Sequence, residues 1–123
     1  MEAKVLADQL QTYIEAHLHE KLTLDSLAER HHYSKFYLNR VFQRTTGVTI
    51  GAYIRARRLE EAARELAETE KPIVSIAMDA GYQSQQAFTM AFREVFQLSP
   101  RAYRTRNRTL TLRSGLRMEV RAA

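Results

Sequence analysis

The sequence has no cysteine, and only two prolines and four glycines among its 123 residues. Without cysteine, disulfide bonds and thiolate zinc sites are excluded. No apolar run reaches the roughly 18 residues of a membrane-spanning helix. The N-terminal segment MEAKVLADQL is charged and amphipathic, whereas a signal peptide would be apolar. We therefore predict a cytoplasmic, nucleoid-associated protein with no membrane partner, large enough for one domain or two small halves.

Signatures of catalysis and of metal binding are also missing. There is no glycine-rich phosphate loop, no Gly-x-Ser-x-Gly motif and no close pair of carboxylates with apolar neighbours. The histidine pairs, His17 with His19 and His31 with His32, lack the i, i+4 spacing of a helical zinc site. We predict that the protein is not an enzyme and holds no metal or cofactor.

Positive charge is present but unevenly distributed. Residues 30–59 contain seven lysines and arginines and no acid, and residues 101–123 contain seven arginines against Glu119 alone. Residues 1–29 and 60–79 each contain six acids and two bases. Such alternation of basic and acidic segments is typical of a protein that binds a polyanion through particular surfaces. The alternative is that the charged segments only keep the surface solvated.

Apolar spacing and capping residues predict an all-α fold of about seven helices. The first helix has apolar residues every three or four positions, at Val5, Leu6, Leu10, Tyr13, Ile14 and Leu18. Later helices are predicted to begin at the caps Thr23, Ser34, Thr49, Ser84 and Ser99, and two of them to end at Gly47 and Gly81. The predicted parts are a first helix-turn-helix subdomain over 1–48, a linking helix over 49–68, a second subdomain over 69–106 and a basic tail over 107–123.

The two halves of the chain repeat. The segment SLAERHHY-SKFYLNRVFQRTTGVTIGAY aligns with SIAMDAGYQSQQAFTMAFREVFQLSPRAY, with one gap after the first tyrosine. The alignment pairs caps, core positions and turn positions, as in Ser34 with Ser84 and Phe42 with Phe92. Each copy is a short helix, a tight turn and a capped second helix, which is a helix-turn-helix.

The tail differs in pattern from the body. Its segment TLTLRSGLRMEV alternates polar and apolar residues around Ser-Gly, which is typical of a short hairpin. A two-stranded piece is only marginally stable alone. The tail is therefore either a hairpin packed on the body, a disordered segment or the start of a further domain.

The second helix of each motif has two distinct faces. The predicted inward residues are Leu38, Val41, Phe42 and Thr45, with Tyr37 at their edge, and Phe88, Ala91, Phe92 and Val95 in the second copy. The outward residues are Phe36, Asn39, Arg40 and Gln43, and Gln85, Gln86, Thr89, Met90 and Arg93. Amides and guanidinium groups fit purine edges in the major groove, and an apolar side chain fits a thymine methyl group. We therefore predict that the outward residues contact DNA bases.

Phosphate contacts are predicted beside these helices. Free backbone N–H groups at a helix N-terminus can donate to a phosphate oxygen, and so can exposed lysine and arginine side chains. The predicted phosphate-contacting residues are Ser34, Lys35, Arg44, Arg55 and Ser84. A linking helix over 49–68 would be about 30 Å long, close to the ~34 Å between successive major-groove segments.

The motifs YSKFYLNRVFQRTTG, GAYIRARRLEEAARELAET, PIVSIAMDAGY, SQQAFTMAFREVF and SPRAYR together resemble the DNA-binding domain of the AraC/XylS family of bacterial transcription regulators. The resemblance covers about residues 5–106. It implies two helix-turn-helix subdomains joined by a long fourth helix, a monomer on an asymmetric site in double-stranded DNA, and activation through contact with RNA polymerase. It carries the base-contacting role to Phe36, Asn39 and Arg40, and to Gln85, Gln86, Thr89 and Met90.

The chain also departs from its family. Phe36 stands where tryptophan is common, Asn39 is shorter than the usual glutamine, and Met90 replaces a common arginine. We therefore predict altered or relaxed specificity at the second half of the DNA site. His32 stands where the second copy has Gly81, at a cost of up to about 1 kcal/mol if φ is positive. The alternative function is a basic helical module that docks on an acidic protein, and selection of duplexes from a random pool separates the two.

Overall fold

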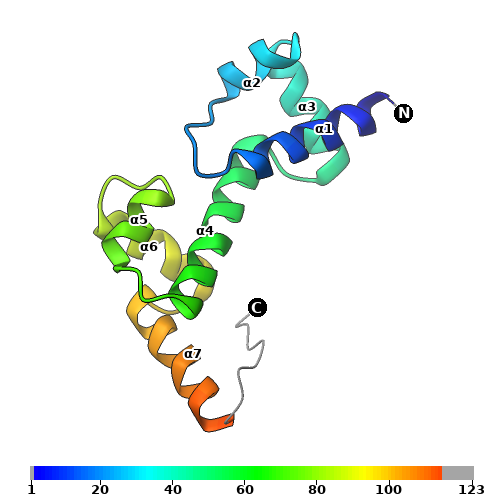
Figure 1. The fold of residues 1–123 in the computed structure, drawn as a ribbon. Helices are drawn as coiled ribbons and strands as arrows, with labels where there is room; N and C mark the ends of the chain where they lie inside the picture. The colour runs from blue at the N-terminus through cyan, green and yellow to red at the C-terminus, as the bar shows by residue number, and fades with distance from the viewer. Residues whose placement is uncertain (1, 115–123) are drawn as a thin grey trace. The chain divides into compact units, whose positions relative to one another are not determined.

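The computed structural model describes residues 2–114. These residues form seven α-helices and no strand, so the predicted all-α fold is confirmed (Figure 1). The helices are α1 (Glu2–Ala16), α2 (Leu24–His31), α3 (Lys35–Thr46), α4 (Ile50–Glu68), α5 (Ile73–Asp79), α6 (Gln85–Phe96) and α7 (Pro100–Ser114). The chain divides into two compact units within α4, between Arg58 and Leu59.

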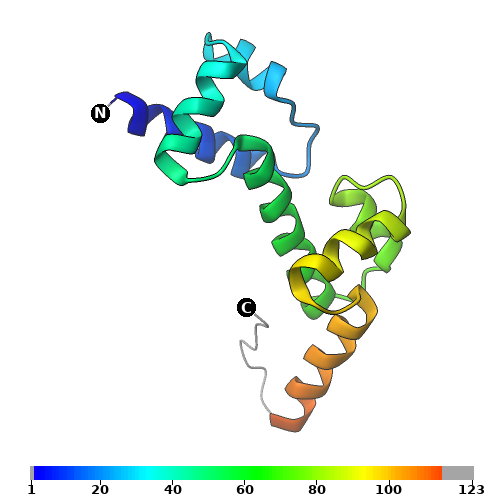
Figure 2. The same ribbon diagram turned by 180° about the vertical axis from the view of Figure 1, so that it is seen from behind.

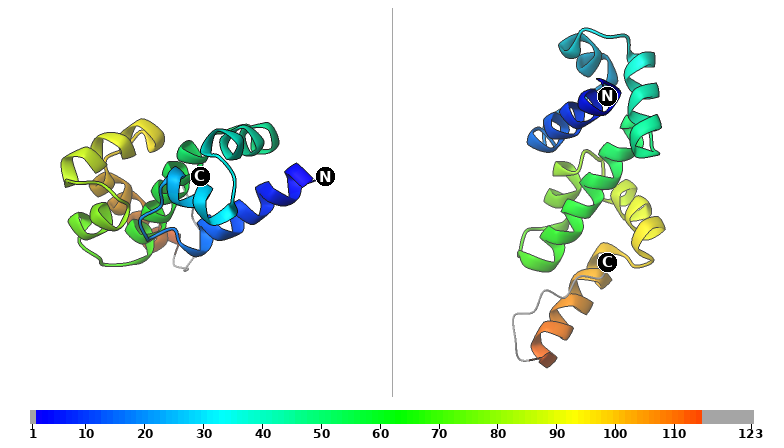
Figure 3. Two further views of the ribbon diagram at one scale, coloured as in Figure 1. Left: turned by 90° about the horizontal axis from the view of Figure 1, so that it is seen from above. Right: turned by 90° about the vertical axis from the view of Figure 1, so that its right-hand side faces the viewer.

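The first unit is built from α1, α2, α3 and the beginning of α4. Helix α3 runs along one side of α1 and α2 (Figure 3, right). One apolar cluster fills this unit, and its fully buried large side chains are Leu10, Ile14, Leu27, Leu38, Phe42 and Ile50. Because α4 begins with Ile50 and Ile54 in this cluster, its first turns belong to the first unit.

The second unit is built from the rest of α4 with α5, α6 and α7 (Figure 2). Its core has its own cluster, whose fully buried large side chains are Leu66, Ile76, Phe88 and Phe92. The two cores share one aromatic arrangement. Phe42 meets Tyr53 edge to face at 5.4 Å between ring centroids, and Phe92 meets Tyr103 in the same way at 5.3 Å. The repeat seen in the sequence is therefore also a repeat of core packing.

Side-chain caps fix where the helices of both motifs begin. The Ser34 Oγ accepts a hydrogen bond from the Tyr37 N–H at 3.1 Å, and the Ser84 Oγ accepts one from the Ala87 N–H at 3.0 Å. Thr23 caps α2 in the same manner through the Ser26 N–H. Each bond satisfies one of the N–H groups that a helix leaves free at its start. These predicted caps are confirmed.

Three side chains predicted to face inward are exposed instead. Val5 is 55% exposed, because the buried stripe of α1 passes through Leu6 and Leu10 and leaves Val5 outside it. Thr45 and Val95 occupy equivalent places in the last turns of α3 and α6, and both are exposed. The helix turns by about 100° per residue, and in α1 and α6 the next residues, Leu6 and Phe96, pack on the core instead.

The strand-like alternation from residue 109 onward does not produce strands within the described residues. Helix α7 continues through Ser114, since no glycine or proline interrupts it after Pro100. Asn107, just before this segment in α7, is buried, and its Nδ2 donates to the Tyr103 carbonyl at 2.8 Å. The hairpin, one of the three alternatives for the tail, is thus contradicted for residues 109–114, which are helical, and its remaining part, residues 115–120, lies outside the described residues.

Candidate nucleic-acid interface

Helix α3 presents an exposed face of mixed chemistry. Phe36 is 72% exposed, which is unusual for a large aromatic side chain. Arg40 and Gln43 follow on the same face, one and two turns further on, and both are exposed. Neither the Arg40 guanidinium nor the Gln43 side-chain amide has a hydrogen bond or ion pair to any residue in the part of the chain that the structure describes. A ring, a guanidinium and an amide therefore remain available to a ligand.

Asn39 lies differently from its neighbours on α3. Its side chain is half-buried, and its Oδ1 accepts a hydrogen bond from the Ile50 N–H at 2.9 Å. That N–H is the first of α4, so Asn39 connects α3 to the start of the next helix. Sequence periodicity placed Asn39 on the outward face, but periodicity contains no information about a partner 11 residues away.

Helix α6 presents an equivalent face in the second unit. Gln85, Gln86 and Arg93 are exposed, and Met90 is 67% exposed. Thr89, which is equivalent to Asn39, is half-buried. The other face of α6 is apolar, with Phe88 and Phe92 fully buried. The predicted outward residues of α6 are thus on the solvent side, with Thr89 at the boundary.

The lysine and arginine side chains of the first unit fall into two groups, those exposed on its surface and those bonded within the unit. Arg44 and Arg55 are exposed and have no partner among the described residues, whereas Lys35 lies 3.4 Å from Asp25 in an exposed ion pair. Arg57 and Arg58 are used inside the unit. Arg58 donates to the carbonyls of residues 18 and 20, at 2.9 and 2.6 Å. The seven bases of residues 30–59 are therefore not all free to meet a polyanion.

Arg57 forms a two-point ion pair with Glu15 of α1. Its Nε and Nη2 donate to the two carboxylate oxygens at 2.7 and 2.9 Å, and the Tyr53 hydroxyl donates to the same carboxylate at 2.9 Å. The Arg57 hydrogen bond lowers the pKa of Glu15 below its ordinary value, against the opposing effect of burial. Burial, together with Glu15, raises the pKa of Tyr53. This cluster ties α4 to α1.

Arginines of α7 show the same division in the second unit. Arg104 donates to the carbonyls of Leu66 and Lys71 at 2.9 and 2.7 Å, and burial lowers its pKa. Arg108 donates to the Thr69 carbonyl. Arg101, in contrast, is exposed in the first turn of α7 and has no partner among residues 2–114. Arg101 was not among the predicted phosphate contacts, because it aligns with Gly51 in the repeat and so has no basic counterpart in the first unit.

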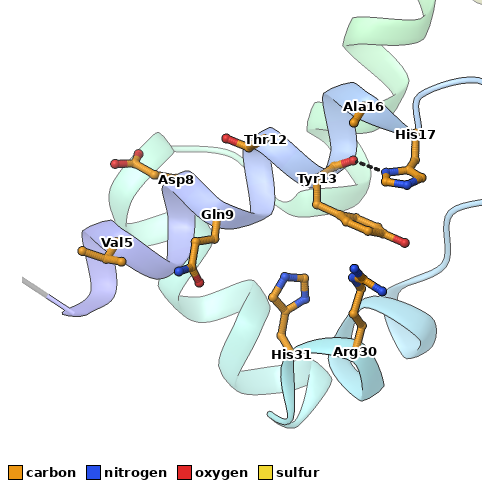
Figure 4. A pocket seen from close by; sticks show the side chains of 9 residues that line it. All are labelled: Val5, Asp8, Gln9, Thr12, Tyr13, Ala16, His17, Arg30 and His31. Carbon is orange, nitrogen blue, oxygen red and sulfur yellow. Dashed lines mark hydrogen bonds between the residues drawn. The ribbon is translucent and has the colours of Figure 1, made fainter.

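Two histidines of the first unit, His17 and His31, border a shallow pocket of about 540 Å³ between α1 and α2 (Figure 4). His17 stacks on Tyr13 at 4.0 Å between centroids, and Arg30 lies 4.5 Å from the same ring. The Nδ1 of His17 donates to the Tyr13 carbonyl, and that of His31 donates to the Leu27 carbonyl. Within residues 2–114, no three histidine, aspartate or glutamate side chains come together as a metal site would require.

Two capped helix-turn-helix motifs, each with an exposed polar face on its second helix, define a double helix-turn-helix protein. A family model described as "Helix-turn-helix domain" matches residues 27–106. Regulatory protein SoxS of Escherichia coli (strain K12) is 48% identical over 103 residues, which are 84% of this chain and 95% of SoxS. Transcriptional regulator Rob of Salmonella typhimurium is 45% identical over 103 residues, which are 84% of this chain and 35% of Rob.

A solved structure extends the comparison to a DNA complex. The DNA-binding domain of AdpA, a global transcriptional factor crystallised with a target DNA, matches with a TM-score of 0.78 and 27% identity over 85% of this chain and 94% of that domain. The chain belongs to the AraC/XylS family and is a DNA-binding transcription regulator. None of the helices within the described residues is long and apolar enough to span a membrane.

Proposed function

We propose that the chain binds an asymmetric duplex site as a monomer, with α3 in one major-groove segment and α6 in the next, and thereby activates transcription in the bacterial cytoplasm. The observation that carries this proposal is the repeated exposed face. Phe36 and Met90, two large apolar side chains, are 72% and 67% exposed in the second helix of each motif. Polar side chains of the types that recognise purines surround both of them.

In the first unit, Arg40 and Gln43 are the side chains best suited to base edges. The guanidinium fork of Arg40 matches guanine O6 and N7, and the Gln43 amide matches adenine. Phe36 supplies apolar contact for a thymine methyl group. In the second unit Gln85, Gln86, Thr89 and Arg93 take the polar roles and Met90 the apolar one.

Phosphate contacts would position each unit on the duplex. Ser34 and Ser84 are the N-caps of the two recognition helices, whose first N–H groups have no acceptor within the helix and suit a phosphate oxygen. Lys35, Arg44 and Arg55 supply positive charge in the first unit. We add Arg101 for the second unit, because it is exposed at the start of α7 and no described residue pairs with it.

Selection of duplexes from a random pool tests the proposal directly. The expected result is a motif of two blocks about 10 base pairs apart, one for each recognition helix. Replacing Arg40 by alanine should cost about 1–3 kcal/mol at the selected site and little on other sequences. A pool that yields no enriched motif would contradict the proposal and favour an acidic protein partner instead.

The family resemblance supports activation by contact with RNA polymerase. Transcription in vitro from a promoter that carries the selected motif upstream of its core elements should increase when the protein is added. A decrease at every spacing between the motif and the core promoter would identify a repressor. The Arg40→Ala variant serves as the matched control, since it should lose activation in proportion to its loss of binding.

A further inference from the structure

We propose that Asn39 is a positioning residue that fixes the recognition helix α3 to the start of α4, and that it does not contact DNA bases. The inference rests on the proposed function, because it concerns which side chains of α3 recognise the site. Three observations carry it: the hydrogen bond that Asn39 makes, its partial burial, and the different chemistry of the equivalent position in the second unit.

The hydrogen bond occupies the atom that base recognition would require. An asparagine amide recognises adenine by donating through its nitrogen and accepting through its oxygen at the same time. In this structure the Oδ1 accepts from the Ile50 N–H at 2.9 Å. The side chain is half-buried, so the amide turns toward α4 while Arg40 and Gln43 remain exposed. The exposed polar face of α3 is therefore narrower than its sequence suggests.

The partner of Asn39 is an N–H group that the fold must satisfy. Ile50 is the first residue of α4, and its N–H cannot bond within the helix. Thr49 accepts from the Ala52 N–H at 3.2 Å, which caps a different amide. Because Ile50 is only 1% exposed, its N–H has restricted access to water. Thr49 and Asn39 thus cap the start of α4 together, and Asn39 does so from α3.

The second unit has neither the backbone N–H that corresponds to Ile50 nor an asparagine that corresponds to Asn39. Ser99 accepts from the Ala102 N–H at 3.1 Å, as Thr49 does from Ala52. The residue that follows Ser99 is Pro100, which has no N–H to satisfy. The position equivalent to Asn39 is Thr89. The asparagine side chain that accepts a hydrogen bond therefore occurs in the first unit, where the helix begins with a free N–H. It is absent from the second unit, where proline has no N–H.

Amide hydrogen exchange measures the link itself. In Asn39→Ala the exchange of the Ile50 amide should become about two- to tenfold faster, as expected for a lost hydrogen bond. In Asn39→Asp a carboxylate oxygen replaces the amide Oδ1 as acceptor and should keep the protection at or above the wild-type level, since negative charge is favourable at a helix start. Equal protection in all three proteins would overturn the proposal.

A double-mutant cycle with Ile50→Pro adds a test that does not depend on exchange. Proline at position 50 copies the second unit and removes the N–H that Asn39 bonds. Asn39→Ala should then lower the denaturant concentration at the midpoint of unfolding in the wild-type background. In the proline background it should leave that midpoint unchanged. The Ile50 side chain is missing from both Ile50→Pro and the double variant, so its loss cancels when these two proteins are compared. Equal effects in both backgrounds would contradict the link.

DNA binding distinguishes positioning from base contact. Affinities for the selected site and for each of its single-base variants should fall by one common factor in Asn39→Ala, with every base preference kept. Arg40→Ala is the control, since it should lose preference at one base pair. Loss of preference at one base pair in Asn39→Ala would overturn the inference while leaving the proposed function intact. Failure of the wild type to select any motif would overturn the function, whereas the exchange and cycle experiments would still test the link.

Discussion

His32 and Gly81 end the first helices of the two motifs in the same left-handed backbone conformation, with φ of 64° and 93°. The bonds around them also agree. The Tyr33 N–H donates to the Ala28 carbonyl and the Tyr82 N–H to the Ala77 carbonyl, both at 3.1 Å. The fold therefore requires positive φ at this turn in both units, and only the second unit meets the requirement with glycine.

Replacing His32 by glycine should stabilise the first unit. A non-glycine residue in the left-handed region costs about 1–2 kcal/mol, and glycine loses part of that advantage through its more flexible unfolded state. We expect the free energy of unfolding to rise by about 0.5–1 kcal/mol. Urea denaturation followed by circular dichroism measures the change.

A matched control for this substitution exists in the second unit. Gln97 ends α6 with φ of 65°, where the first unit has Gly47 with φ of 89°. Gln97→Gly should stabilise by a similar amount, and Gly81→Ala should destabilise. A loss of stability in His32→Gly would mean that the imidazole makes a favourable contact that outweighs the backbone strain.

The sequence was sufficient to predict features that depend on neighbouring residues along the chain. Ser34 and Ser84 cap their helices as predicted, because a cap acts over three residues. The alignment of His32 with Gly81 marked a position where φ could be positive, and φ of His32 is 64°. The exposure of Phe36 and Met90 followed from helical periodicity.

Features that depend on distant partners could not be predicted in this way. The bond from Ile50 to Asn39 joins two helices, and the bonds of Arg58 span about 40 positions of the chain. Long polar side chains choose such partners only after the core has placed the helices, so a count of bases overstates the charge available to DNA. Helix ends are also poorly specified by periodicity, which is why the exposed Val95 was predicted to be buried.

Replacing Met90 by arginine should change specificity at the second half of the DNA site. Met90 is 67% exposed on α6 and offers only apolar contact. An arginine there can bond guanine O6 and N7, which discriminates against other bases by about 1–3 kcal/mol. Duplex selection with only the second half-site randomised should therefore enrich guanine at one position. Met90→Ala is the control and should enrich none, and enrichment in neither variant would remove position 90 from the base-contacting set.

Arg55 and Arg101 should each contribute one phosphate contact. Removing one phosphate contact lowers the slope of log affinity against log salt by about 0.9. Alanine at either position should therefore reduce the slope by that amount, with equal loss of affinity on every sequence. Arg104→Ala is the comparison, since Arg104 bonds the carbonyls of Leu66 and Lys71. Its substitution should lower stability and leave the salt slope unchanged. A slope unaffected by Arg101→Ala would remove Arg101 from the interface.

The stability contributed by the Glu15 ion pair should disappear in acid. The Arg57 hydrogen bond lowers the pKa of Glu15 in the folded protein below the ordinary 4.5. A carboxylate with a depressed pKa stabilises the fold above its unfolded pKa, and this contribution is lost as the pH falls through the folded pKa. Glu15→Gln should therefore be less stable than the wild type at pH 7, by about 1 kcal/mol or less because the pair is partly exposed.

The pH dependence separates this effect from a simple loss of packing. Urea denaturation of the wild type and of Glu15→Gln between pH 7 and about pH 3 should give unfolding free energies that converge as the Glu15 carboxylate is protonated. Glu20→Gln is a suitable control, because the Glu20 side chain is exposed and has no ion pair among the described residues. Its difference from the wild type should stay near zero throughout. A gap for Glu15→Gln that remains constant down to pH 3 would show that the residue acts through shape and hydrogen bonding, not through its charge.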